Sequence, residues 1–445
     1  MAGLKTPDIA PKRLSKTQYV ENFADLHQPL SDHEALVESD RCYFCYDAPC
    51  MKACPTSIDI PLFIREIQSG HPKSAAKSIF DQNILGGMCA RVCPTETLCE
   101  QACVREHAEG KPVKIGLLQR YATDQAMADP HPYTRAKSSG KKIAVVGAGP
   151  AGLACAHRLS MRGHDVTIFE ARKKSGGLNE FGIAAYKSVD EFAAKEVDFV
   201  LAIGGIKIEH GKALGKKKLT LAQLRHDYDA VFIGLGLSGV NALDTKNEQA
   251  KGIEAAVTYI SNLRQAKDLS KLPVGRNVVV IGGGMTAIDI AIQSKLLGAE
   301  NVTILYRRSA AHMKASGYEQ ELAQTKGVNI MHWVQPKKVL VKGGKAKGLK
   351  CEHTIEKNKK LVGTGETFEI NADMIFKAIG QTYVDVTGGT IALDQGRIKV
   401  DAEKRTSVKG IWAGGDCTAG GNDLTVTAVD DGRRAAESIH MFLSA

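Results

Sequence analysis

Several features are missing from this chain of 445 residues, and each absence narrows what it can be. No apolar run reaches the roughly 20 residues that a helix needs to cross a bilayer, so we expect no membrane-spanning segment. The first residues are polar and mixed in charge, so we expect no export signal. No Cys-x-x-Cys pair follows Cys103, which argues against a disulfide reductase. The sequence also shows no arrangement typical of a hydrolytic triad.

The charge balance is basic, with 59 Lys and Arg against 49 Asp and Glu and a net charge of +10. Nucleic-acid binding is one interpretation of such an excess, but the charges are dispersed along the chain. We therefore interpret them as solvated loops on a moderately basic surface, some of which can attract an anionic cofactor or an acidic partner. We expect neither nucleic acid nor a membrane as a partner. The length leaves room for about three domains.

Cysteine is the residue type that organises the sequence, since eight of its eleven cysteines lie between positions 42 and 103. The first group reads Cys-x2-Cys-x4-Cys-x3-Cys-Pro from Cys42 to Pro55, and the second contains Cys89, Cys93-Pro94, Cys99 and Cys103. Thiolates this closely spaced, with proline following, favour iron–sulfur ligation. Disulfides are disfavoured without an export signal, and zinc sites usually show two clear cysteine pairs per ion. So many free thiols predict a reducing, cytoplasmic location.

The region around the cysteines is predicted to be helical. We expect helices that begin after Ser31 and that cover residues 61–67, 74–80 and 115–127. Proline and glycine residues between 129 and 140 predict a linker that ends this part of the chain.

The pattern changes after this linker to that of a dinucleotide-binding fold. A strand at 142–146, a glycine loop, a helix and a second strand that ends at Glu170 follow in order. The glycines Gly147, Gly149 and Gly152 permit the tight turn and let a pyrophosphate approach the helix N-terminus. Glu170 can accept hydrogen bonds from a ribose diol. A further glycine turn at 176–178 offers backbone that can lie against a flavin.

The same unit recurs with a strand at 277–281, a GxGxxA loop that begins at Gly282, and a strand at 301–306. Arg307 and Arg308 stand where the first unit has its acid. Two guanidinium groups there can bind a 2′-phosphate, as NADP sites do. The alternative is a pair of surface arginines, so the second unit favours NADPH without excluding NADH.

The C-terminal part is predicted to complete the first of these folds. A strand at 410–413 runs into Gly415 and Asp416, and Asp416 can hold hydroxyl groups of a flavin's ribityl or phosphate side. A helix from about Thr425 presents backbone N–H groups that can stabilise negative charge on a reduced flavin ring. The second dinucleotide fold is then an insertion into the first.

These patterns predict an α/β protein with an N-terminal α-helical iron–sulfur domain and two nested Rossmann-like domains. The predicted limits are 1–137 for the helical domain, 138–270 with 380–445 for the FAD domain, and 271–379 for the NAD(P) domain. Nicotinamide gives two electrons as a hydride and an iron–sulfur cluster accepts one at a time, so a flavin belongs between them. No domain remains for a second substrate, which implies an external acceptor in another subunit.

The motifs at Cys42–Pro55, Cys89–Thr95 and Ile115–Ala122 resemble the family that contains the small subunit of glutamate synthase and the N-terminal half of dihydropyrimidine dehydrogenase. The likeness is greatest to the separate flavin subunit of the two-subunit bacterial dehydrogenase. The glutamate synthase pattern has a longer gap before its fourth cysteine and usually an acid where Gln119 stands.

The resemblance implies two 4Fe–4S clusters whose ligands cross between the cysteine groups, whereas spacing alone suggests one cluster per group. One cluster would take Cys42, Cys45, Cys50 and the amide oxygen of Gln119; the other would take Cys54, Cys93, Cys99 and Cys103. Cys89 would then be a spectator.

The resemblance also implies the dinucleotide contacts. FAD would contact Gly147, Gly149, Ala151, Gly152, Glu170, Leu178, Lys187, Gly415, Asp416 and Thr425. NADPH or NADH would contact Gly282, Gly284, Met285, Thr286, Arg307, Arg308 and Lys314.

The activity implied is that of an electron-input subunit in a hetero-oligomer. Electrons would pass from NAD(P)H through FAD and the clusters to a partner that carries FMN and further clusters, where uracil or thymine becomes the 5,6-dihydro base. No residue of this chain corresponds to the catalytic cysteine for pyrimidine reduction. The alternatives are a glutamate synthase small subunit and a zinc-binding interaction protein with vestigial nucleotide folds.

Overall fold

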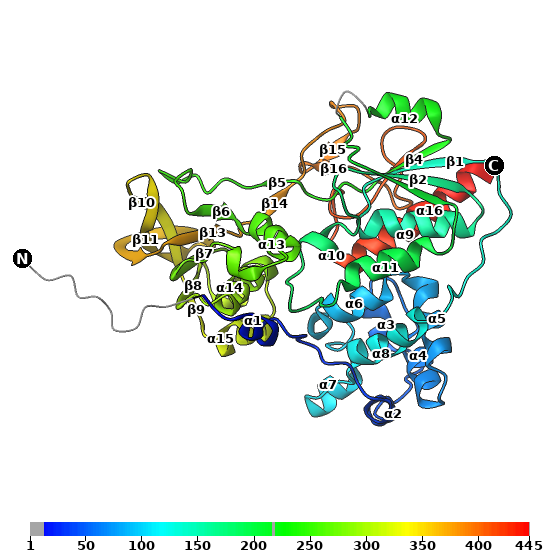
Figure 1. Ribbon diagram of the computed structural model, residues 1–445, viewed down its shortest axis with the longest axis horizontal. Helices are drawn as coiled ribbons and strands as arrows, with labels where there is room; N and C mark the ends of the chain where they lie inside the picture. The colour runs from blue at the N-terminus through cyan, green and yellow to red at the C-terminus, as the bar shows by residue number, and fades with distance from the viewer. Residues whose placement is uncertain (1–12, 216–218, 445) are drawn as a thin grey trace, which may run out of the picture. The chain divides into compact units, whose positions relative to one another are not determined.

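The computed structural model describes residues 13–215 and 219–444. Residues 1–12 of the predicted helical domain, and residues 216–218 and 445 of the predicted FAD domain, lie outside the described residues. The chain forms two compact units (Figure 1). The large unit comprises residues 25–183, 187–241 and 381–445, and the small unit comprises residues up to 24, 184–186 and 242–380.

The first part of the large unit is helical, as predicted. Its elements are α2 (Asp32–Asp40), α3 (Pro49–Ala53), α4 (Ile60–Gln68), α5 (Pro72–Gln82), α6 (Gly86–Val92), η1 (Thr95–Thr97), α7 (Val104–Glu109) and α8 (Ile115–Met127). Ser31 caps α2 through its side chain and Glu34 completes the capping box, so the predicted start is confirmed. The apolar faces of α4, α5 and α8 meet in a core that includes the buried Phe63, Ile79 and Leu118.

The second part of the large unit is a parallel five-stranded sheet in the order β17-β4-β1-β2-β3. Its strands are β1 (Lys142–Val146), β2 (Asp165–Glu170), β3 (Ile206–His210), β4 (Ala230–Ile233) and β17 (Ile411–Ala413). β17 pairs with β4, which confirms that the C-terminal part completes the first dinucleotide fold. Short pairs accompany the sheet: β5 (Gly239–Val240) with β14 (Gln381–Thr382), and β15 (Leu393–Asp394) with β16 (Arg397–Ile398).

The helices that pack against strands of this sheet are α9 (Pro150–Met161), α12 (Leu221–Asp227) and α16 (Thr425–Ser444). Beside them, α11 (Phe192–Leu201) contacts α9, and α10 (Leu178–Phe181) contacts α11. In Figure 1, α9 and α16 run together beside the strands. Their approach is close because a Cβ at Gly432 of α16 would lie 2.1 Å from the carbonyl oxygen of Ala151 in α9. A glycine at this crossing therefore lets the C-terminal helix lie against the helix that follows the first glycine loop.

The small unit repeats the arrangement with a parallel sheet in the order β6-β13-β7-β8-β9. Its strands are β6 (Ile253–Ala255), β7 (Asn277–Ile281), β8 (Asn301–Tyr306), β9 (Val328–His332) and β13 (Met374–Lys377). The predicted β-rich stretch forms an antiparallel sheet of β10 (Val334–Lys342), β11 (Lys345–Lys357) and β12 (Lys360–Asn371). The helical elements are α1 (Lys16–Asn22), α13 (Ala256–Gln265), η2 (Leu269–Lys271), α14 (Met285–Leu296), η3 (Ala310–His312) and α15 (Gly317–Thr325).

The limits of these compact units differ from the predicted domain limits in two places. α1 belongs to the small unit rather than to the helical domain, because the amide of Asn22 donates to the carbonyl of Leu296 at 2.9 Å and Leu14 packs on Gly298. The small unit also begins at Ala242, since β6 pairs with β13 and so becomes an edge strand of the second sheet. No local sequence pattern predicts the contacts of α1 with the small unit or the pairing of β6 with β13.

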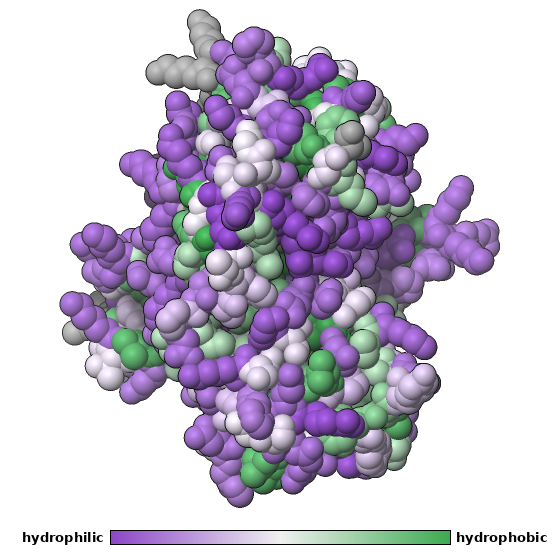
Figure 2. All heavy atoms as spheres, turned by 90° about the vertical axis from the view of Figure 1, so that its right-hand side faces the viewer, coloured by the Kyte–Doolittle hydropathy of each residue, from purple (hydrophilic) through white to green (hydrophobic). Residues whose placement is uncertain are grey.

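Within residues 13–215 and 219–444, no helix combines the length and the apolar character that a membrane span requires. Figure 2 shows a mainly hydrophilic face, on which the hydrophobic side chains appear as small separate spots. Such scattered apolar side chains are normal on a protein surface.

Candidate functional site

The first glycine loop joins β1 to α9 in the large unit, and Gly147 and Gly152 have no room there for a side chain. Gly147 has φ +101°, and a Cβ there would lie 2.4 Å from the carbonyl oxygen of Gly234. A Cβ at Gly152 would lie 1.9 Å from the carbonyl oxygen of Gly147. The loop thus folds tightly and ends at Gly149, the N-cap of α9, where free backbone N–H groups can receive phosphate.

The acid of this unit lies at the end of β2, directly under the loop. The carboxylate of Glu170 accepts hydrogen bonds from the backbone N–H groups of Ala148 and Arg172, each at 2.8 Å. Each carboxylate oxygen retains a further lone pair for a ribose hydroxyl. Glu170 is buried, so its orientation is fixed before any dinucleotide binds.

The second glycine turn packs on the first. The N–H of Gly176 donates to the carbonyl of Ala148 at 2.8 Å, and a Cβ at Gly177 would lie 2.6 Å from Cα of Gly149. Gly177 has φ +55° and is the N-cap of α10, whose first residue, Leu178, is 40% exposed. The turn therefore presents backbone and one exposed apolar side chain beside the phosphate loop, which fits the flavin contact predicted for Leu178.

The C-terminal segment brings Asp416 and the start of α16 to the same unit. Burial is the main cause that raises the pKa of Asp416 to about 6, while Arg397 opposes this shift. Gly415, with φ +75°, donates its N–H to Asp431 at 2.9 Å. The hydroxyl of Thr425 donates to the side-chain oxygen of Asn179 at 2.9 Å, which ties the first residue of α16 to α10.

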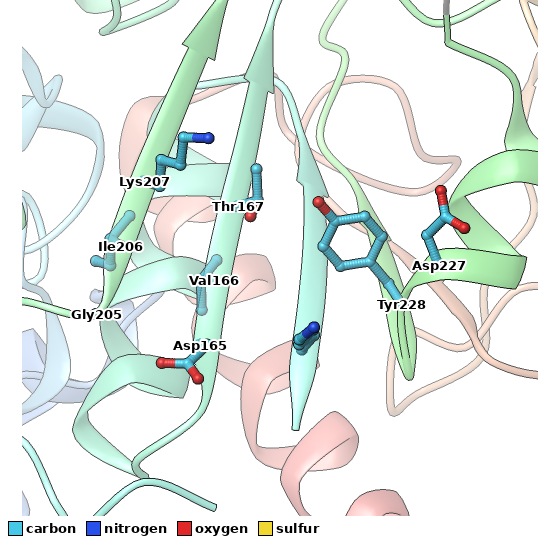
Figure 3. A pocket seen from close by; sticks show the side chains of 9 residues that line it. Asp165, Val166, Thr167, Gly205, Ile206, Lys207, Asp227 and Tyr228 are labelled. Atoms are coloured by element: carbon cyan, nitrogen blue, oxygen red, sulfur yellow. The ribbon is translucent and has the colours of Figure 1, made fainter. Parts of the chain in front are cut away.

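A surface hollow of about 630 Å³ lies at the other end of this sheet (Figure 3). Asp165 begins β2, Ile206 begins β3 and Tyr228 precedes β4, so these residues mark the amino ends of the strands. Dinucleotides bind outside the carboxyl ends of parallel strands. The hollow in Figure 3 is therefore separate from the glycine loops and from the residues predicted to contact FAD.

The second glycine loop, in the small unit, has the same construction. Gly282 has φ +144°, and a Cβ there would lie 2.2 Å from the carbonyl oxygen of Ala378. A Cβ at Gly283 would lie 2.4 Å from the ring of Tyr306, so this loop packs against the end of β8. Gly284 is the N-cap of α14 and has open space around its Cα. The free helix N-terminus, followed by Met285 and Thr286, suits a pyrophosphate.

Three cationic residues follow the end of β8 in the chain. Arg307 and Lys314 are exposed and Arg308 is half-buried. Thr354 donates to the carbonyl of Arg307, and the carbonyl of Arg308 accepts from the N–H of Trp333, so the backbone here is anchored on both sides. Anchored backbone with projecting cationic side chains fits the predicted binding of a 2′-phosphate.

The cysteines of the helical part form two neighbouring groups. The thiols that interact electrostatically in the first group are Cys42, Cys45, Cys50 and Cys103. Burial raises the pKa of Cys42 and raises that of Cys50 to about 12. The N–H of Phe44, a residue with φ +51°, donates to Sγ of Cys42 at 3.4 Å. A backbone donor of this kind stabilises a thiolate.

The second group contains Cys54, Cys93, Cys99 and Cys89. A hydrogen bond with Cys89, reinforced by burial, raises the pKa of Cys93 well above its ordinary value, and burial does the same for Cys99. Three of the four predicted ligands of the second cluster lie together here, whereas Cys103 interacts with Cys42 and Cys50 of the first group. Cys89, the predicted spectator, contacts Cys93 directly.

Gln119 lies on α8 and is buried, with 8% of its surface exposed. Its Nε2 donates to the carbonyl of Gly86 at 2.7 Å. Because this hydrogen bond commits the amide nitrogen, the amide oxygen is the atom that remains available as a ligand. A buried, oriented glutamine fits the predicted ligand better than an ordinary surface residue of a helix would.

The donor chemistry of these groups suits an iron–sulfur cluster. In the described part of the chain, no three His, Cys, Asp or Glu side chains converge on one point as ligands of a single metal ion. A 4Fe–4S cluster makes a different demand, because its four cysteines bind a cluster rather than one ion. Buried thiolates are costly without nearby positive charge, which cluster irons supply.

Two features of the flavin fold have no sequence signal. Asn179 is buried at 3% exposure and anchors α16 through Thr425. The hydroxyl of Thr427, in the first turn of α16, is buried and has no hydrogen-bond partner among the described residues. Threonine and asparagine are common in loops and helix ends, so only their placement beside the predicted FAD contacts makes them candidate site residues.

Two family models cover most of the chain. The model described as dihydropyrimidine dehydrogenase domain II, 4Fe-4S cluster, matches residues 19–130, and the model described as pyridine nucleotide-disulphide oxidoreductase matches residues 141–432. The NAD-dependent dihydropyrimidine dehydrogenase subunit PreT of Salmonella typhimurium is 34% identical to this chain. The alignment covers 92% of this chain and 94% of that protein. This chain belongs to the dihydropyrimidine dehydrogenase flavin-subunit and glutamate synthase small-chain family.

A second relative shows the other branch of this family. The glutamate synthase (NADPH) small chain of Escherichia coli is also 34% identical, and the alignment covers 97% of this chain and 96% of that protein. Among solved structures, FprA of Mycobacterium tuberculosis in complex with NADPH is similar to this chain, with a TM-score of 0.57 at 18% identity. The superposition covers 68% of this chain and 85% of the FprA chain. That likeness shows the fold alone.

Membership of the dihydropyrimidine dehydrogenase and glutamate synthase small-chain family confirms three predictions. The chain is an NAD(P)-dependent iron–sulfur flavoprotein oxidoreductase. Its cofactors are FAD, 4Fe–4S clusters and a nicotinamide dinucleotide. Its fold class is α/β, with an N-terminal iron–sulfur domain and two dinucleotide-binding folds. The disulfide named in one model has no counterpart here, because no Cys-x-x-Cys pair follows Cys103.

Proposed function

We propose that this chain is the electron-input subunit of a dihydropyrimidine dehydrogenase. The observation that carries the proposal is the buried Gln119, whose amide nitrogen is held by the carbonyl of Gly86. The resemblance places an amide oxygen ligand at this position in the dihydropyrimidine dehydrogenase branch and usually an acid in the glutamate synthase branch. Curated relatives of both branches match with equal identity, so the ligand position discriminates better than overall similarity.

The residues proposed to hold FAD in the large unit have distinct tasks. The loop at Gly147–Gly152 and the N-terminus of α9 bind the pyrophosphate, and Glu170 orients the ribose through its fixed carboxylate. Asp416 binds flavin-side hydroxyls, and the start of α16 at Thr425 directs backbone N–H groups at the flavin ring. When bound, a flavin accepts an electron pair and releases single electrons.

In the small unit, Gly282–Thr286 would bind the pyrophosphate of the nicotinamide dinucleotide. Arg307, Arg308 and Lys314 would bind a 2′-phosphate, which makes NADPH the proposed donor. NADH remains the alternative, since the curated Salmonella relative is named as NAD-dependent.

The acceptor is proposed to be a separate subunit that contains FMN and iron–sulfur clusters and reduces uracil or thymine to the 5,6-dihydro base. The two cluster ligand sets, Cys42/Cys45/Cys50/Gln119 and Cys54/Cys93/Cys99/Cys103, would deliver electrons to it. The hetero-oligomer and the cytoplasmic location follow from the same proposal and stay predictions.

Activity with NAD(P)H and uracil, alone and with the candidate FMN subunit, tests this function. Cofactor-loaded, anaerobically purified chain should reduce an artificial acceptor alone and should reduce uracil only with that partner. Glutamate formation with a glutamine-dependent large subunit, together with no uracil reduction, would instead identify a glutamate synthase small chain. Zinc without iron would reject both and leave the zinc-binding interaction protein.

A further inference from the structure

Helix α6 connects the flavin fold to the cysteines within the large unit. Gly87 and Met88, near its start, face α11 of the flavin fold, and the helix is followed at once by its C-cap, Cys93, a proposed cluster ligand. The same short helix also carries Cys89, and its first carbonyl holds Gln119. Any shift of α6 relative to α11 therefore moves proposed ligands of both clusters relative to the flavin fold.

Glu196 of α11 makes the polar contact that fixes this helix. Its carboxylate accepts the backbone N–H of Met88 at 2.7 Å, and the N–H of Gly87 is a second donor. These N–H groups belong to the first turn of α6, where they have no partner within the helix. Glu196 is 1% exposed, so the contact is shielded from water.

The approach depends on the absence of a side chain at Gly87. A Cβ there would lie 2.7 Å from the ring of Phe192 and 3.0 Å from the carboxylate of Glu196. Arg91, one turn further along α6, stacks its guanidinium over the Phe192 ring at 3.4 Å. It also donates to the carbonyl of Gly87 at 2.9 Å and binds both carboxylate oxygens of Asp124 on α8 at 2.8 Å.

A buried carboxylate is unfavourable unless its interactions compensate. The charged groups that act on Glu196 are Arg91, which is buried beside it, and Asp124, which is paired with Arg91. An apolar side chain at position 196 would fill the space equally well but would leave two buried N–H groups unpaired. The carboxyl group of Glu196 therefore fixes the position of α6 through these two hydrogen bonds, in addition to filling space.

We propose that Glu196 is a positioning residue that holds α6, and through it Cys93 and Gln119, at a fixed distance from the flavin fold. Glu196 is not among the residues predicted to contact a cofactor or a cluster, so it acts on electron transfer through helix placement. This role of Glu196 rests on one part of the proposed function, the passage of electrons from flavin to the clusters. It does not depend on the identity of the acceptor.

The test compares Glu196→Ala with Glu196→Gln in cofactor-loaded, anaerobic protein mixed rapidly with NADPH. Flavin bleaching should proceed as in the unaltered protein. Cluster reduction, followed by freeze-quench EPR, should slow by about tenfold in Glu196→Ala, as expected for loss of a buried hydrogen bond. Glu196→Gln should recover most of the rate, because its amide oxygen still accepts an N–H.

Glu66→Gln is the matched control, since Glu66 accepts a hydrogen bond from Ser78 within the helical part and away from α11. Reduction by dithionite distinguishes slow transfer from cluster loss, because it fills every cluster that is present. Full EPR intensity with a cluster-reduction rate unchanged in Glu196→Ala would overturn the proposal. An equal slowing in Glu196→Ala and Glu66→Gln would overturn it as well. Failure of uracil reduction with normal transfer to the clusters would reject only the proposed function.

Discussion

The backbone N–H of Met88 donates a 2.7 Å hydrogen bond to the carboxylate of Glu196, and this bond joins the helical part of the large unit to its flavin fold. The donor lies one residue before Cys89, and the acceptor lies on the helix that follows Lys187, a residue predicted to contact FAD. Two parts that are consecutive in sequence are thus joined by a buried polar contact as well as by a linker.

Glu196 should make stability depend on pH. Burial raises its pKa from an ordinary 4.5 to about 8. The folded protein then holds this proton more tightly than the unfolded chain, so the stabilisation is complete below about pH 4.5 and is lost as the pH rises to about 8. The loss amounts to at most about 1.4 kcal/mol per pH unit in this window.

Thermal unfolding of Glu196→Gln between pH 5 and pH 8 checks this expectation, with Glu66→Gln as the control. The melting temperature of the glutamine variant should vary less with pH than that of the unaltered protein. Parallel curves for the two proteins would show that Glu196 does not titrate in this range.

Gly177→Ala should weaken FAD retention. The new Cβ would lie 2.6 Å from Cα of Gly149, so the second glycine turn would move away from the phosphate loop. Overpacking of this kind costs about 1–3 kcal/mol, or roughly fivefold to 150-fold in affinity. The ratio of FAD to protein after gel filtration measures the effect.

Gly110→Ala is the matched control for backbone strain. Gly110 also has a positive φ, +63°, but a Cβ there would meet nothing within 4 Å. It should therefore lose some stability while keeping its FAD. Equal FAD loss in both variants would mean that strain, rather than the contact with Gly149, governs retention.

Arg307→Ala should lower the preference for NADPH over NADH. A guanidinium that binds a 2′-phosphate contributes about 1.5–3 kcal/mol, so KM for NADPH should rise by about tenfold or more while KM for NADH stays unchanged. Arg276→Ala, which removes an exposed arginine paired with Glu300, is the control. An unchanged ratio of the two KM values would remove Arg307 from phosphate recognition.

Gln119→Leu should remove one cluster, so that about half of the iron and sulfide is lost. Iron analysis and EPR of anaerobic protein measure this, and Gln125→Leu on the same helix should retain both clusters. The neighbouring thiols Cys89 and Cys93 provide a second comparison: Cys93→Ser should lose a cluster, whereas Cys89→Ser should not. Loss of iron from Cys89→Ser would contradict its assignment as a spectator.

Local patterns predicted most of the secondary structure around the sites. The helix at Ile115–Met127 and the strands at Asn277–Ile281 and Asn301–Tyr306 begin and end where the sequence indicates. Such elements follow from apolar periodicity, and glycine loops follow from the conformations that only glycine adopts readily.

The sequence by itself determined two dinucleotide-binding folds and a cysteine-rich helical domain, because glycine spacing, strand-end charges and cysteine spacing are local properties. Only the tertiary structure decided that α1 and β6 belong to the small unit, that Cys103 lies beside the first cysteine group, and that Glu196 holds α6. These relationships join residues far apart in the chain, and hydrogen bonds or burial between distant residues leave no periodic trace in the sequence.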